Sequence, residues 1–349
     1  MTDKTNNLVP ACMHFNHNSI SPPMNFGAPD ADIDALTHNA VAVPLLPLGL
    51  IRATGEEAGT FLHRLLSSDV AGLAGDAVQW TSFNTAQGRM LANFLLWRDG
   101  SDLCLAASSD LLPALLKKLS LYILRTKVTL SLPERALIGL AGPQAGEHLL
   151  HAALPVPEAD MRQAVSNSRR TIRLDEHLFI LDLSAAEAPD VFDSLCQAGI
   201  TAGGMASWQL AAIRTGLPLV TVATQEAFVA QMLNFEIIGG VSFTKGCYPG
   251  QEIIARTQHL GKPKRRMFRI GLLAPVPVAG IGTALYGSAS AETVGTIVNF
   301  APLPEGGEAL AVIRTETVRA KDEIRVGSPD GPCAQVLGLP YEVPEMKCP

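Results

Sequence analysis

Two alternating runs of strand and helix patterns, followed by a region of strand patterns alone, most constrain the fold of this chain. In residues 41–135 the patterns predict strand, helix, strand, strand, helix and strand, which is the order of a ferredoxin-like unit. Residues 136–265 show the same order without a readable sequence repeat. In residues 266–349, short β-type runs between Gly and Pro predict a small all-β barrel. The expected fold class is therefore α+β, with ferredoxin-like α/β units and a C-terminal β-barrel.

Local patterns predict where several elements begin. Residues 54–57 match a capping box at the start of a helix, and Ser109 and Asp110 offer an N-cap for another helix. Residues 225–234 carry a helical pattern, and residues 241–243 form a short β-type run. The motif that follows residue 243 is thus expected in a turn between a strand and a helix.

Composition favours a soluble protein from a reducing compartment. The 349 residues are enough for two or three domains. A formal charge of -6 argues against a protein that coats nucleic acid or anionic membrane with its whole surface. The six cysteines form no CxxC pair, which argues against a disulfide framework or a zinc site. Residues 1–40 are expected to form a flexible leader without a targeting signal, and the protein is expected to be cytoplasmic and free of membranes.

The motif that most clearly indicates function is the octapeptide Lys-Gly-Cys-Tyr-Pro-Gly-Gln-Glu at residues 245–252. Its glycines allow a tight turn, and the start of the following helix directs free N–H groups and a positive dipole end outward. Lys245 adds positive charge next to Cys247, and both effects lower the pKa of a thiol. The pattern favours a reactive Cys247 over a buried structural thiol. Gln251 and Glu252 either orient a ligand or cap the helix that they begin.

A basic segment follows the octapeptide in an otherwise acidic chain. It suits carboxylate or phosphate groups, and a solvated linker between domains explains it equally well. Its six positive residues are Arg256, Lys262, Lys264, Arg265, Arg266 and Arg269.

Two further arginines are candidates for a ligand pocket. Arg214 follows a predicted helix that carries Trp208, where it could clamp an anion or satisfy the helix C-terminus. Arg89 follows Gly88 in a predicted tight turn before a strand, either at a pocket rim or only in a hairpin. The sequence leaves both alternatives open.

The octapeptide, Arg256 and the basic run at residues 261–265 resemble the signature of the YgfZ family of folate-binding proteins. That family is related in fold to the aminomethyltransferase, or T-protein, of the glycine cleavage system. The resemblance covers most of the chain from residue 49 onward, with residues 49–128, 140–143, 208–220 and 294–299 as its weaker parts. It implies an aminomethyltransferase-like arrangement of three domains around a hole that receives tetrahydrofolate or a 5-formyl derivative.

Two departures from the T-protein separate the chain from that enzyme. The T-protein turn resembles Lys-x-Asp-Phe-x-Gly-x-Glu, so an acid stands where this chain has Cys247. An Asp pair of the T-protein, one member of which is catalytic, corresponds to Ala92 and Asn93 here. An asparagine cannot take a proton or bear the charge that folate activation requires. The resemblance therefore argues against a conventional aminomethyltransferase.

By position, the resemblance implies that Cys247 and Lys245 are the reactive residues. The implied folate-binding residues are Tyr248, Gln251, Glu252, Arg214, Asn93 and Arg89. The implied role is an accessory protein for assembly or repair of iron-sulfur enzymes, including those that thiomethylate tRNA. A folate-dependent aminomethyltransferase or amine demethylase is the alternative. A third alternative is a scaffold whose residues 262–269 contact tRNA.

Overall fold

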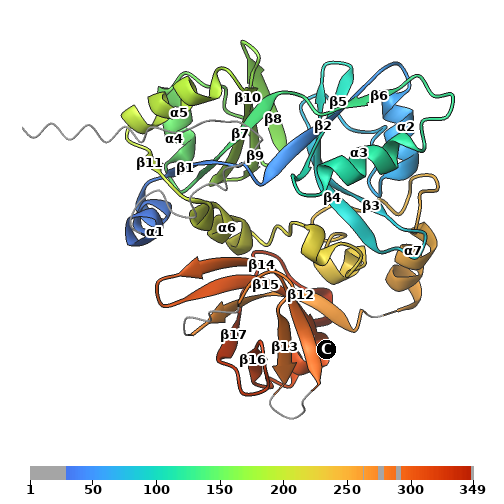
Figure 1. The fold of residues 1–349 in the computed structure, drawn as a ribbon, viewed down its shortest axis with the longest axis vertical. Helices are drawn as coiled ribbons and strands as arrows, with labels where there is room; N and C mark the ends of the chain where they lie inside the picture. The colour runs from blue at the N-terminus through green and yellow to red at the C-terminus, as the bar shows by residue number, and fades with distance from the viewer. Residues whose placement is uncertain (1–28, 262, 274–278, 288–291, 347–349) are drawn as a thin grey trace, which may run out of the picture.

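The computed structural model describes residues 29–261, 263–273, 279–287 and 292–346. They form two α/β units and a β-barrel that meet around α6 (Met205–Arg214) (Figure 1). α6 contacts strands of the second unit on one side and strands of the barrel on the other. No described helix has both the length and the apolar character needed to cross a bilayer.

The first unit is an antiparallel sheet with two helices on one face. Its strand order is the ferredoxin-like order with one strand, β3, added at the edge. In sheet order the strands are β3 (Val78–Asn84), β4 (Met90–Asp99), β5 (Asp102–Ser108), β2 (Leu48–Thr54) and β6 (Thr129–Ser131). α2 (Ala58–Leu65) and α3 (Leu112–Ser120) bury Phe61, Leu62 and Leu115 against this sheet because apolar residues recur at helical spacing.

The second unit repeats this plan and accepts one strand from the start of the chain. α4 (Ala145–His151) and α5 (Ala188–Gln197) pack on its outer face. In sheet order the strands are β11 (Thr201–Ala202), β1 (Val41–Pro44), β7 (Arg135–Ala141), β10 (Leu178–Ser184), β9 (Arg169–Asp175) and β8 (Arg162–Ser166). β1 pairs antiparallel with β7 and parallel with β11. The expected start of the first unit at residue 41 thus includes a strand that lies in the second sheet.

The inner faces of the two sheets share one core. Leu50 and Leu95 of the first sheet pack in the same cluster as Leu178 and Ile180 of the second. The buried guanidinium of Arg170 also joins the sheets, because it contacts Asp182 at 3.0 Å and Asp99 of β4 at 2.6 Å. The two units therefore form a single block.

The C-terminal region forms the predicted barrel. The six barrel strands close in the order β12 (Arg265–Leu272), β15 (Gly306–Arg314), β14 (Thr293–Leu303), β13 (Ala284–Gly287), β16 (Ile324–Val326) and β17 (Cys333–Leu337). The short helix α8 (Thr315–Arg319) and the 3-10 turn η3 (Pro344–Met346) follow β15 and β17. Apolar side chains such as Ile270, Ile297 and Ala311 fill the barrel. The α+β fold class is confirmed.

The structure differs from the expected leader at residues 29–38, which form α1 (Pro29–His38). Asp32 is buried, and its Oδ2 accepts a hydrogen bond at 3.0 Å from the backbone N–H of Gly204, immediately before α6. Ala35 packs in the core between the sheets. Tertiary contacts thus order a segment whose sequence lacks a sustained hydrophobic period. Residues 1–28 lie outside the described residues.

Both predicted helix caps are wrong, because tertiary contacts take the capping side chains. Neither α2 nor α3 has a side-chain hydrogen bond at its N-cap. The Glu57 carboxylate instead accepts a hydrogen bond from the backbone N–H of Lys127 at 2.7 Å. The Asp110 carboxylate accepts one from the backbone N–H of Val222 at 3.0 Å.

Two predicted elements before the octapeptide are also wrong. Residues 225–234 contain only a 3-10 turn, η2 (Ala230–Leu233), which follows an earlier one, η1 (Val222–Thr224). The part before η2 runs beside the start of β4. There the N–H of Met90 donates to the carbonyl of Phe228, and the N–H of Glu226 donates to the carbonyl of Met90. Residues 241–243 form no strand, since only Ser242 bonds to the backbone of another segment, at Ser67. Pairing with β4 outweighs the local helical pattern.

Candidate functional site

The octapeptide forms the predicted turn before a helix, α7 (Gln251–Leu260). Gly250 precedes this helix in the left-handed conformation, with φ of 82°. A Cβ atom on Gly250 would lie 2.6 Å from the carbonyl oxygen of Thr85 and 2.7 Å from the Cα atom of Gly88. The β3–β4 hairpin and the octapeptide therefore meet at two glycines, Gly88 and Gly250, which are 162 residues apart in the chain.

This contact predicts a sharp difference between two glycines of the octapeptide. We expect Gly250→Ala to lower the free energy of unfolding by about 2 kcal/mol or more, since it adds left-handed strain and a clash with backbone atoms. Gly246→Ala is the matched control, because no atom lies within 4 Å of the added Cβ. Urea denaturation of both variants measures the difference. Equal stability of the two would contradict the close packing at Gly250.

Lys245 anchors the turn to the first unit. Its ammonium donates to the backbone carbonyls of Leu66 at 2.6 Å, Ser68 at 3.0 Å and His63, at the C-terminal end of α2. The same Nζ lies 5.1 Å from the ring centroid of Tyr248. Burial lowers the pKa of Lys245 to about 8, and the Asp69 carboxylate acts in the opposite direction. Lys245 thus holds the turn by its charge.

Cys247 and Tyr248 point to different surroundings. Cys247 is exposed and carries a free thiol, whereas Tyr248 is buried in the core of the first unit. No hydrogen bond joins the Lys245 ammonium to the Cys247 sulfur in the described residues. Burial raises the pKa of Tyr248 to about 12, so its hydroxyl stays protonated. The predicted activation of Cys247 by Lys245 remains a prediction.

The first turn of α7 leaves Gln251 half-buried and Glu252 exposed. Neither side chain forms a hydrogen bond with the part of the chain that the structure describes. The suggested capping of the helix by these two residues is therefore not observed. Both remain available to a ligand or partner at the surface.

The structure assigns Arg89 and Arg214 to contacts within the protein. The Arg89 guanidinium donates to the carbonyl of Ala227 at 2.7 Å, and Arg89 bridges to Val229 beside β4. The Arg214 guanidinium contacts the Glu308 carboxylate of β15 at 2.8 Å. The anion that Arg214 holds is therefore one of the protein's own carboxylates.

The basic segment divides into buried and exposed charges. Arg266 is buried and paired with Glu236, and Arg269 contacts Glu308 at 2.8 Å. Arg256, Lys264 and Arg265 are exposed. Lys262 lies outside the described residues. Among the described positions, three of the predicted positive charges face solvent.

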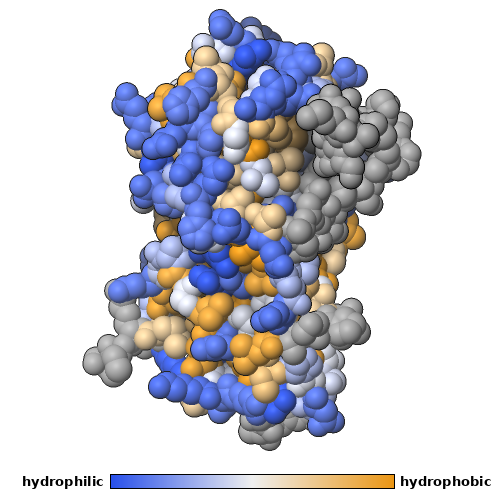
Figure 2. All heavy atoms as spheres, turned by 90° about the vertical axis from the view of Figure 1, so that its left-hand side faces the viewer, coloured by the Kyte–Doolittle hydropathy of each residue, from blue (hydrophilic) through white to orange (hydrophobic). Residues whose placement is uncertain are grey.

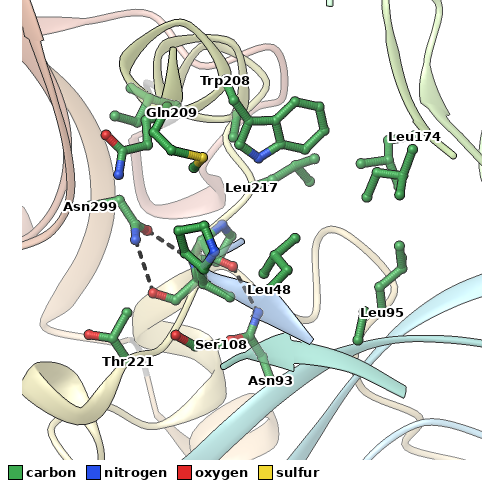
Figure 3. A pocket seen from close by; sticks show the side chains of 18 of the residues that line it. Leu48, Asn93, Leu95, Ser108, Leu174, Trp208, Gln209, Leu217, Thr221 and Asn299 are labelled. Carbon is green, nitrogen blue, oxygen red and sulfur yellow. Dashed lines mark hydrogen bonds between the residues drawn. The ribbon is translucent and has the colours of Figure 1, made fainter. Parts of the chain in front are cut away.

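A cavity of about 160 Å³ lies where the two units and the barrel meet, beside α6 (Figure 3). Figure 3 shows Trp208, Leu217 and Leu174 on one side, and Gln209, Asn299 and Thr221 on the other. The described lining residues are Pro47, Leu48, Trp80, Asn93, Leu95, Ala106, Ser108, Leu174, Leu178, Ile180, Met205, Trp208, Gln209, Ala212, Ile213, Leu217, Pro218, Leu219, Thr221, Ile281, Asn299 and Phe300. None of them carries a charge.

Two asparagines hold one wall of the cavity, the segment of residues 217–221. Asn93 of β4 donates to the carbonyl of Pro218 and accepts from the N–H of Val220, both at 2.8 Å. Asn299 of β14 exchanges two hydrogen bonds with the backbone of Leu219, both at 3.0 Å. Each side-chain amide both donates and accepts a hydrogen bond. The first unit and the barrel therefore bind the same backbone segment, residues 217–221.

No protein-family model matches the chain. The tRNA-modifying protein YgfZ of Photorhabdus laumondii is 26% identical over 333 residues, which cover 93% of this chain and 100% of that protein. The tRNA-modifying protein YgfZ of Escherichia coli strain K12 is 27% identical over 301 residues, covering 85% of this chain and 91% of that protein. Over most of its length, the chain is therefore similar to YgfZ proteins.

A solved structure supports the same fold. The glycine cleavage system aminomethyltransferase T from Bartonella henselae has a TM-score of 0.75 to this chain and is 18% identical. The match covers 90% of this chain and 89% of that chain. The aminomethyltransferase-like fold expected from the sequence is confirmed.

The octapeptide and the cavity are separate features of the structure. No residue of 245–252 is among the described lining residues, and of the predicted site residues only Asn93 is. Sequence reasoning missed Gln209 and Asn299 as site residues. The only early signal was that both lie in stretches, 208–220 and 294–299, that resemble the family.

Proposed function

We propose that the chain is a folate-binding accessory protein for tRNA modification, in which the cavity holds one ring of the pterin of a reduced folate. The observation that carries this proposal is the uncharged cavity at the junction of the two units and the barrel. The proposed ligand is tetrahydrofolate or its 5-formyl form. The proposed clients are iron-sulfur enzymes, including those that thiomethylate tRNA, whose assembly or repair the protein supports.

The size and lining of the cavity fit one ring of the two-ring pterin of a folate. A cavity of about 150 Å³ with apolar walls takes up a single aromatic ring, and this one measures about 160 Å³. Trp208 and the leucines offer an apolar wall, while the amides of Gln209 and Asn299 lie opposite (Figure 3). An elongated ligand such as a folate would place its ring inside and its acidic tail outside.

The lining supports a binding role rather than proton transfer. No carboxylate, imidazole or ammonium is among the described lining residues, so general acid-base groups are lacking there. The Asn93 amide is already hydrogen-bonded to the backbone of Pro218 and Val220. Within this proposal, the exposed Cys247 thiol acts at the surface toward a client, and the exposed Arg256, Lys264 and Arg265 assist contact with tRNA.

A calorimetric titration with tetrahydrofolate and with its 5-formyl form tests the proposal. We expect the wild type to bind, and Ala212→Phe to lose at least tenfold in affinity because the ring fills the cavity. Ala198→Phe, at an exposed position after α5, is the matched control and should bind as the wild type does. Absence of binding to the wild type, or full binding by Ala212→Phe, would refute the proposed site.

A further inference from the structure

Gln209 is the one amide among the described lining residues that is left without a partner for its oxygen. Asn93 and Asn299 each use both ends of their amides on the backbone of residues 217–221. The Gln209 Oε1 atom is buried, yet no described residue donates a hydrogen bond to it. Of the three side-chain amides among the described lining residues, two have a hydrogen-bond donor for their oxygen and the third, Gln209, has none.

An unsatisfied buried oxygen has a cost that native structures avoid. Leaving a buried acceptor without a donor costs about 1–3 kcal/mol, and most such groups in proteins have a partner. Where the orphaned atom lies in the wall of a cavity, the expected partner is a donor inside that cavity. Gln209 therefore points to a ligand that brings N–H groups.

The rest of the lining restricts that ligand further. Because no described lining residue is charged, a charged ring would lose its hydration without gaining a counter-charge. Trp208 precedes Gln209 on α6, and Figure 3 shows the indole and the amide on different sides of the pocket. A flat ring between them could pack on the indole and direct its polar edge to the amide.

We propose that Gln209 determines the ligand specificity of the cavity by accepting a hydrogen bond from the exocyclic amino group of a neutral heteroaromatic ring. This inference rests on the proposed folate-binding function and assigns it a residue. The ring of the ligand and its amino group therefore determine which ligand the cavity binds. The acidic tail of the ligand gains no counter-charge from the cavity, so affinity does not depend on its length.

Two substitutions and three ligands test the assignment by calorimetry. The variants are Gln209→Met, which keeps the shape of the side chain without an amide, and Gln197→Met at an exposed position of α5 as control. The ligands are tetrahydrofolate, its 2-desamino analogue and tetrahydropteroate, which lacks the glutamate tail. Thermal unfolding of each variant verifies that the fold is intact.

We expect the wild type and Gln197→Met to prefer tetrahydrofolate over the desamino analogue by about tenfold or more, since a lost partner for a buried oxygen costs about 1–3 kcal/mol. Gln209→Met should bind both weakly and with nearly equal affinity. Tetrahydropteroate should bind the wild type within about threefold of tetrahydrofolate. An unchanged preference in Gln209→Met, or a strong loss with tetrahydropteroate, would overturn this inference while leaving folate binding intact. Failure of the wild type to bind any of the three would instead overturn the proposed function.

Discussion

Replacing Cys247 with Ala should abolish the ability of this protein to restore tRNA thiomethylation in a strain that lacks it. The reason is that Cys247 is the exposed thiol of the octapeptide turn, and alanine cannot form a thiolate or a bond to sulfur or metal. Folate affinity should stay unchanged, because Cys247 does not line the cavity. Stability should change by less than about 0.5 kcal/mol, as for most exposed positions. Quantifying the modified nucleoside by mass spectrometry measures the effect.

Cys333→Ala provides the comparison. Cys333 lies in the barrel, where its thiol donates a hydrogen bond to the Glu323 carboxylate at 2.7 Å. Cys333→Ala therefore removes a thiol, as Cys247→Ala does, but from a position outside the octapeptide. That variant should complement fully. If Cys247→Ala restores modification as well as Cys333→Ala does, the thiol has no part in the function, whatever the cavity binds.

Asn93→Asp should destabilise the protein by about 2–4 kcal/mol at neutral pH. The substitution removes the donor to the Pro218 carbonyl and places a carboxylate beside that oxygen in a buried position. A protonated aspartic acid could still donate to Pro218 and accept from Val220. Burial should therefore raise the pKa of the new carboxyl above its ordinary value of about 3.9. The loss is then smallest in acid and grows as the pH rises through the raised pKa.

Urea denaturation between pH 4 and pH 8 measures this dependence. Asn167→Asp, in an exposed turn between β8 and β9, makes the same chemical change without burial and should cost little at any pH. Subtracting its stability from that of Asn93→Asp removes the general effect of pH on the protein. A difference that stays flat across the range would show that residues 217–221 do not depend on the Asn93 amide.

Local chemistry decided which parts of the octapeptide could be foreseen. A glycine before a helix needs no distant information, so the turn at Gly250 and the start of α7 were predicted from neighbouring residues. The caps at residues 54–57 and 109–110 failed for the opposite reason. Glu57 and Asp110 bond to Lys127 and Val222, and a local reading of the sequence does not show those partners.

The cavity could not be predicted from neighbouring residues either, because its lining comes from segments that are distant in the sequence. Its lining combines β4, α6, the segment of residues 217–221 and β14, which touch only in the finished fold. Asn93 was singled out for a lost acid, and the structure shows its amide bound to a backbone segment 125 residues away. Arg214 was predicted as a residue that could bind an anionic ligand, but its guanidinium pairs with the Glu308 carboxylate of the barrel, which is distant in sequence.

The position of β1 has a consequence for synthesis on the ribosome. Residues 41–44 emerge before every other described strand, but their partners β7 and β11 begin at residues 135 and 201. The first sheet can assemble before residue 135 is synthesised. Until β7 and β11 follow, the backbone groups of β1 lack their hydrogen-bond partners. Translation must therefore proceed past residue 202 before both edges of β1 are paired, so this strand leaves the ribosome with exposed edges that are open to wrong pairing.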